Sequence, residues 1–61
     1  MEILENKTIQ LNLNYIKVKF KNKIYEMYLY FNEQKEEYNF YYKNGNKPND
    51  IDFEYNILCN L

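Results

Sequence analysis

The sequence predicts an all-β domain, a small antiparallel meander of four to five strands, either open or closed into a small barrel. Apolar and polar residues alternate with a period of two along most of the chain, which is typical of half-buried strands. The β-forming residues Ile, Tyr and Phe dominate these stretches, and the only glycine and the only proline fall together in one loop. A chain of 61 residues is expected to form one small domain spanning residues 1–61.

The first part of the predicted sheet covers residues 8–20 and contains a change of phase. Apolar residues occupy odd positions over residues 8–13 and even positions over residues 16–20. One extra residue near Asn14–Tyr15 explains the change, either as a β-bulge in one long bent strand or as a tight turn. We favour the bulge, because a two-residue turn would place Tyr15 in a left-handed conformation that its side chain disfavours. Residues 1–6 are too short a stretch to assign.

Two turns are predicted in the middle of the chain, a two-residue turn at Asn22–Lys23 and a polar loop over residues 32–37. When the strands are paired across both turns, apolar residues lie opposite one another on one face. A slip by one residue would move these side chains to the other face. The pairs across the first turn are Phe20 with Tyr25, Val18 with Met27 and Ile16 with Leu29. The pairs across the second turn are Phe31 with Tyr38, Leu29 with Phe40 and Met27 with Tyr42. These residues form the predicted core face, and the other face carries a row of alternating charge made by Lys19, Glu26 and Lys43.

The last segment follows a loop over residues 43–50. Residues 51–57 alternate and are rich in β-formers, which favours a further strand. The alternative is a β-sheet with a short C-terminal helix. Asn49 or Asp50 would cap that helix, and Ile51, Tyr55 and Leu58 would share one of its faces.

Tyrosines and lysines are interleaved on the face opposite the predicted core. These candidate partner-binding residues are Tyr15, Tyr28, Tyr30, Tyr41, Lys17, Lys19 and Lys43. Tyrosine is enriched at protein interfaces, and it also stacks on bases in single-strand nucleic-acid binders, where lysines follow the phosphates. The structural alternative is that the terminal strands cover these rings as a second core layer.

Three carboxylates, Asp50, Asp52 and Glu54, fall on one side of the predicted last strand and form a candidate acidic patch. Such a row can hold a hard cation or imitate a row of phosphates, but solvated charge on a strand face is far commoner. We therefore assign no metal to it.

The residues that are absent exclude several classes of function. The chain has no histidine, no serine and one cysteine, Cys59, so neither an intrachain disulfide nor a usual zinc site is possible. The familiar nucleophile–base pairs are equally absent, so we expect no enzyme and no cofactor. Small chains usually need an additional source of stability, namely disulfides, a metal or a partner subunit. A partner subunit is the source that remains here, which predicts a homodimer.

Composition also bears on origin and on function. Asn, Lys, Ile and Tyr, which AT-rich codons specify, are abundant, whereas alanine and arginine are absent. A short AT-biased chain suggests a phage or mobile element of a low-GC bacterium. The chain shows no signal peptide or apolar span, which predicts the cytoplasm of the host bacterium and no membrane partner.

We expect a non-catalytic binding protein, a small inhibitor that binds and blocks a host protein of antiviral defence. The alternative is a single-strand nucleic-acid-binding β domain that uses the tyrosine and lysine face. The net charge of −1 provides no general attraction to nucleic acid and so favours the first expectation.

Overall fold

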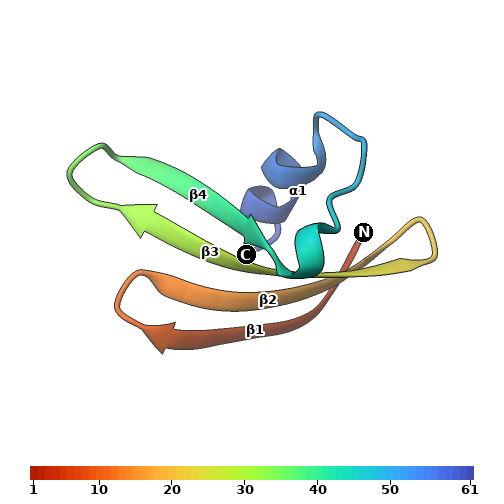
Figure 1. Ribbon diagram of the computed structural model, residues 1–61, viewed down its shortest axis with the longest axis horizontal. Helices are drawn as coiled ribbons and strands as arrows, with labels where there is room; N and C mark the ends of the chain where they lie inside the picture. Colours follow the sequence, from red (N-terminus) through yellow and green to blue (C-terminus); the bar gives the residue numbers. More distant parts are fainter.

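The computed structural model describes all 61 residues and shows a four-stranded antiparallel meander with a short C-terminal helix (Figure 1). Its strands follow in chain order as β1 (Glu2–Gln10), β2 (Leu13–Phe20), β3 (Lys23–Asn32) and β4 (Glu37–Tyr42). A 3-10 turn, η1 (Lys43–Gly45), follows β4, and the helix α1 (Phe53–Cys59) comes last. The predicted meander is confirmed. The sheet does not close into a barrel, because β1 and β4 remain its two edges.

The change of phase near residue 14 is a tight turn and not the predicted bulge. Strand β1 ends at Gln10, which pairs with Leu13, so Leu11 and Asn12 form the turn between β1 and β2. Asn12 has a φ of 62°, a left-handed conformation that asparagine tolerates better than most residues. The Phe31 N–H donates to the Asn12 carbonyl at 2.9 Å, which holds the turn against β3. The prediction of one long bent strand was therefore wrong.

The turn between β2 and β3 lies one residue earlier than predicted. Lys21 and Asn22 have φ values of 49° and 64°, which define a type I′ hairpin turn. As a result Val18 faces Tyr25 rather than Met27, and each predicted pair across this turn is wrong by two residues. A shift of two keeps every side chain on its face, so the predicted core face still points inward.

The register between β3 and β4 agrees with the prediction. Its confirmed pairs are Phe31 with Tyr38, Leu29 with Phe40 and Met27 with Tyr42. Pairing through three successive residues of one face shows that the polar loop between these strands was placed correctly.

The core forms between one face of the sheet and α1. Its fully buried apolar residues are Ile16, Val18, Met27 and Leu29 of the sheet with Phe53 and Ile57 of the helix. The Phe53 ring lies edge-on to Phe20 and Tyr25, with centroid distances of 5.1 and 5.5 Å. Seven residues are too few for a helix that is stable alone, so α1 depends on this packing. No helix of the chain has the length and apolar character needed to cross a membrane.

The strand predicted over residues 51–57 was wrong, and the helix considered as its alternative is present. Its buried face differs from the one expected, because Ile51 is 99% exposed and Tyr55 is 67% exposed. A further strand would have extended one edge of the sheet and left the core face bare. A helix covers that face, and Phe53 and Ile57 point into it.

Candidate functional site

The sheet face opposite α1 carries the residues predicted to bind a partner. Strands β2, β3 and β4 and the start of η1 place them there, and we call this surface the tyrosine–lysine face: Tyr15, Lys17, Lys19, Tyr28, Tyr30, Tyr41 and Lys43. No segment of the chain covers it, because α1 packs on the other side. The rings of Tyr28, Tyr30 and Tyr41 are 37%, 38% and 57% exposed. The second core layer considered from the sequence is therefore absent.

Three of the tyrosines form a row that crosses the sheet. Tyr15 lies opposite Tyr28, and Tyr28 lies opposite Tyr41. The rings of Tyr15 and Tyr28 meet edge to face with centroids 5.8 Å apart, a geometry worth about 0.5–1.5 kcal/mol beyond buried area. Tyr30 lies two residues along β3, so its ring extends the aromatic surface toward the β3–β4 turn. The rings thus make one contiguous surface and not isolated side chains.

A row of alternating charge lies beside the tyrosine row. Lys17 of β2 faces Glu5 on one neighbouring strand and Glu26 on the other. Glu26 accepts a hydrogen bond of 2.5 Å from the Tyr15 hydroxyl, and the Lys43 ammonium lies 3.5 Å from the same carboxylate oxygen. The contact between Glu26 and Lys43 was predicted, whereas Lys19 faces Ile24 and not Glu26.

The shared hydrogen bond shifts the acidity of both partners. It raises the pKa of Tyr15 to about 12, with burial and the Glu26 charge acting in the same direction. It also lowers the pKa of Glu26, and the nearby charge of Lys43 adds to that effect. Tyr15 therefore stays protonated and Glu26 stays ionised at neutral pH, which fixes a donor and an acceptor at the edge of the aromatic row.

Acidic side chains balance the lysines of this face. Besides the row just described, Lys7 lies 3.2 Å from Glu5, and Lys19 lies opposite Glu2 on β1. The face therefore offers exposed rings with locally neutralised charge. A surface that tracks a phosphate backbone needs uncompensated cations instead.

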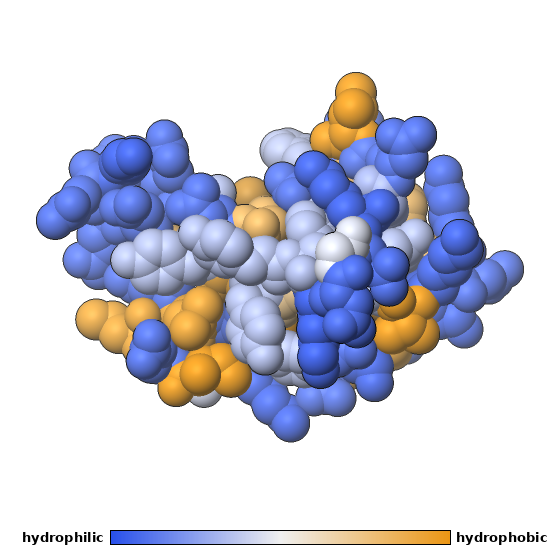
Figure 2. Space-filling model, viewed as in Figure 1, coloured by the Kyte–Doolittle hydropathy of each residue, from blue (hydrophilic) through white to orange (hydrophobic).

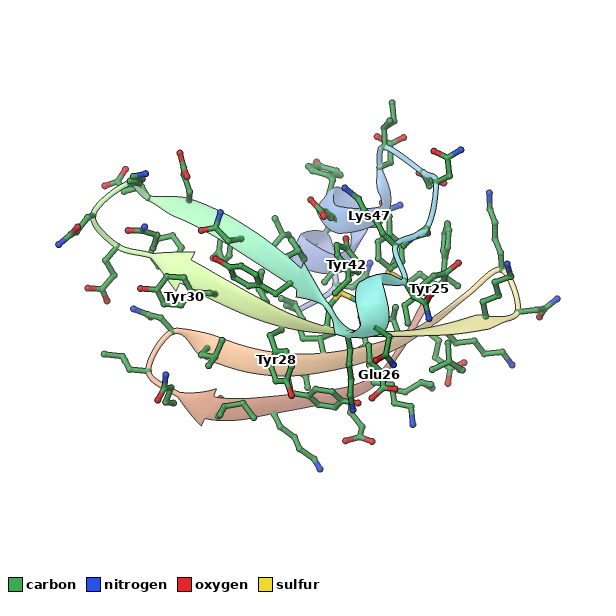
Figure 3. All side chains as sticks on the ribbon, in the orientation of Figure 1. Tyr25, Glu26, Tyr28, Tyr30, Tyr42 and Lys47 are labelled. Carbon is green, nitrogen blue, oxygen red and sulfur yellow. The ribbon has the colours of Figure 1, made fainter.

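The views of the molecule agree with this division of faces. Figure 3 shows Tyr28 and Glu26 near one another on the sheet, whereas Tyr42 and Lys47 lie beside α1. In Figure 2, pale residues of intermediate hydropathy run across the middle of the visible surface, with hydrophobic residues in orange below them at the left and polar residues in blue above and to the right.

Comparison with known proteins gives no assignment. No protein-family model, curated protein or solved structure matches the chain.

The residues of the predicted acidic patch do not lie along a strand, because Asp50 and Asp52 precede α1 and Glu54 lies in its first turn. Asp50 accepts the Asp52 N–H at 2.9 Å and lies 3.8 Å from the Lys21 ammonium. Glu54 accepts a hydrogen bond of 2.6 Å from the Tyr42 hydroxyl, and burial together with this bond raises the pKa of Tyr42. These carboxylates hold the helical segment against the sheet, and they do not converge on a common cation site.

The largest hollow on the surface lies away from the tyrosine–lysine face. It measures about 390 Å³ and is lined by Lys23, Ile24, Tyr25, Asn46 and Lys47. Lys47 is already engaged, since its ammonium lies 5.8 Å from the centre of the Tyr42 ring and 4.0 Å from Glu54. The lining has no carboxylate or thiol that would act as a nucleophile or base.

Sequence reasoning missed Glu5 and Lys7, which belong to the same face. The residues before Asn6 were left unassigned, and the turn at Leu11–Asn12 was not recognised. Asparagine next to the change of phase was the available signal, because it is one of the few residues that adopt a left-handed turn conformation. Had the turn been placed there, β1 would have paired with β2 and brought Glu5 and Lys7 beside Lys17 and Tyr15.

Proposed function

We propose that the protein is a non-catalytic inhibitor that binds a host protein through the tyrosine–lysine face and blocks it. The observation that carries this proposal is the row of half-buried Tyr15 and exposed Tyr28 and Tyr41 on an uncovered sheet face. Tyrosine offers a large, rigid contact area with a polar tip at low entropic cost, and it is frequent among the residues that dominate binding energy.

The charges of the face support a protein partner over a nucleic acid. Each lysine lies beside or opposite a carboxylate, so the surface combines both signs around an apolar strip. Such a pattern matches a folded protein surface, where a polar rim of mixed charge surrounds apolar anchors. Stacked bases would bring a phosphate with each nucleotide close to Glu5 and Glu26.

The composition supports the biological class of this proposal. Abundant asparagine, lysine and tyrosine, and the absence of alanine and arginine, fit a gene from an AT-rich phage or mobile element. A product of this kind acts inside the host bacterium by occupying one target. We place that target among the proteins of antiviral defence.

Affinity capture from host lysate tests the proposal directly. We expect the immobilised protein to retain one dominant protein, and Tyr28→Ala or Tyr41→Ala to weaken its capture at least about tenfold, as for an interface anchor. Tyr55→Ala is the matched control, because Tyr55 is also an exposed tyrosine but lies on the outer side of α1. Capture that responds equally to all three substitutions, or no captured protein, would contradict the proposal.

Titration with labelled single-stranded DNA and RNA separates the competing function. At moderate salt we expect no saturable binding, because the lysines of the face are paired with carboxylates. Binding that weakens steeply with salt and is lost in Tyr28→Ala would instead identify a single-strand nucleic-acid module.

A further inference from the structure

Strand β1 leaves one long edge of the sheet without a partner. It spans nine residues, pairs only with β2, and lies at the free side of the sheet in Figure 1. Nearly all of its side chains are exposed, including Leu4 and Ile9, which are apolar. An open strand edge presents unpaired backbone donors and acceptors, so it is a template for pairing with another chain.

Two irregularities confine the part of β1 that is free to pair regularly. The register with β2 shifts between Ile3 and Glu5 and again between Thr8 and Gln10. Such bulges bend a strand and end its regular hydrogen-bonding edge. The regular segment therefore runs from Glu5 to Thr8, and its centre is close to Asn6.

The charges of this segment are complementary to themselves. Glu5 and Lys7 point to the tyrosine–lysine face on either side of Asn6, and they form an ion pair of 3.2 Å within one chain. In an antiparallel pair of identical strands centred on Asn6, Glu5 of each copy lies opposite Lys7 of the other. Unlike charges directly opposite one another stabilise a sheet, whereas like charges destabilise it.

We propose that two copies of the chain pair through their β1 edges, antiparallel, with a two-fold axis through Asn6. Sliding either way by two residues would place Glu5 opposite Glu5 or Lys7 opposite Lys7, so that like charges meet at the centre of the interface. The charges therefore select the register centred on Asn6, and its three central pairs lie between the two bulges. The edge formed by β4 has no such self-complementary charge.

The axis of this dimer stands perpendicular to the sheet. The two tyrosine–lysine faces then lie on the same side of one continuous eight-stranded sheet, and both helices lie on the other side. This inference is independent of the proposed function, since it concerns residues of β1 and a different measurement.

Charge reversal and mixing test the interface by sedimentation velocity across micromolar to near-millimolar concentrations. We expect the wild type to dimerise. Glu5→Lys and Lys7→Glu should each weaken dimerisation at least about tenfold, because each brings like charges together twice at the symmetric interface. An equimolar mixture of the two variants should form a heterodimer, in which the lysines of one copy face the glutamates of the other.

The mixture also shows whether the variants are folded, because two unfolded variants would not assemble. Loss of dimerisation can then be assigned to the interface and not to unfolding. The doubly exchanged protein, Glu5→Lys with Lys7→Glu, should form the homodimer again. Lys35→Glu and Glu36→Lys serve as matched controls, because both residues are exposed in the β3–β4 turn. A monomeric wild type, variants that dimerise as well as the wild type, or failure of the mixture to assemble would each overturn the proposal.

Discussion

At the scale of single residues, the tyrosines of the open face divide into two kinds. The Tyr15 hydroxyl donates a hydrogen bond to Glu26, and its ring packs edge to face on Tyr28. Tyr15 therefore fixes the positions of neighbouring side chains on this face. The Tyr28 and Tyr41 hydroxyls make no such hydrogen bond within the chain, and both residues are exposed. Sequence reasoning grouped all of these tyrosines together, because alternation reports the face on which a side chain lies and not the bonds it forms there.

The bond between Tyr15 and Glu26 predicts an alkaline limit to stability. The pKa of Tyr15 is about 12 in the folded protein against an ordinary value of 10.0, so the folded state retains a proton that the unfolded state has lost. The contribution is complete below pH 10.0 and disappears as the pH rises through about 12. We expect Tyr15→Phe to flatten this decline, measured as urea unfolding midpoints on both sides of pH 10.0.

The same bond acts in the opposite sense at low pH. The pKa of Glu26 is lowered from 4.5, so its contribution is present above pH 4.5 and is lost as the pH falls through the folded value. Glu26→Gln should therefore flatten the decline at both ends of the pH range. A Glu26→Gln protein that keeps the alkaline decline of the wild type would show that another group is responsible.

At the scale of elements, the pattern of apolar residues fixes faces better than registers. The strand pairs across the polar loop were predicted correctly, whereas the pairs across Lys21–Asn22 were wrong by two residues. A slip of two leaves every apolar residue on the core face, so the test of apolar pairing does not detect it. The conformation of the turn decides the register, and two successive left-handed residues, one of them a lysine, were not foreseeable from composition.

The last element shows a different limit of sequence reasoning. Phe53 and Ile57 satisfy a strand, since both are odd-numbered, and they also satisfy a helix, since they lie four residues apart. β-propensity favoured the strand. The helix forms because the apolar face of the sheet has to be covered. That requirement can be recognised only after the other strands have been arranged into a sheet.

Removal of the main anchor of α1 should unfold the domain. Phe53 is almost fully buried, and loss of such a ring costs about 3–5 kcal/mol, a large share of the stability of a small domain. We expect Phe53→Ala to abolish cooperative urea unfolding monitored by circular dichroism. Tyr55→Ala, on the exposed side of the same helix, should change stability by no more than about 0.5 kcal/mol. An unchanged midpoint for Phe53→Ala would show that α1 does not hold the core.

At the scale of the whole molecule, the core is small and closed on one side only. Six buried apolar residues supply it, and the opposite face of the sheet contributes none of them. A domain of this size gains stability from any partner that binds only its folded state. The homodimer expected from composition would supply such a partner, and the pairing inferred at the β1 edge describes how that homodimer would form.

Coupling between assembly and folding gives a measurement that needs no labelled partner. If the dimer forms only from folded chains, the melting temperature of the wild type should rise with protein concentration. The Glu5→Lys protein should melt at a temperature that is independent of concentration over the same range. A melting temperature that is constant for the wild type would argue that its stability comes from the monomer alone.

The helix covers one face of the sheet and leaves the other bare, and this asymmetry separates two kinds of evolutionary constraint. Along β2 and β3, alternate positions pack toward Phe53 and Ile57, while the positions between them lie on the open face, where they contact one another and solvent. A substitution at Tyr28 or Tyr30 therefore alters the outer surface without reshaping the interior. The outer surface can therefore change one alternate residue at a time while the core that holds the fold stays the same.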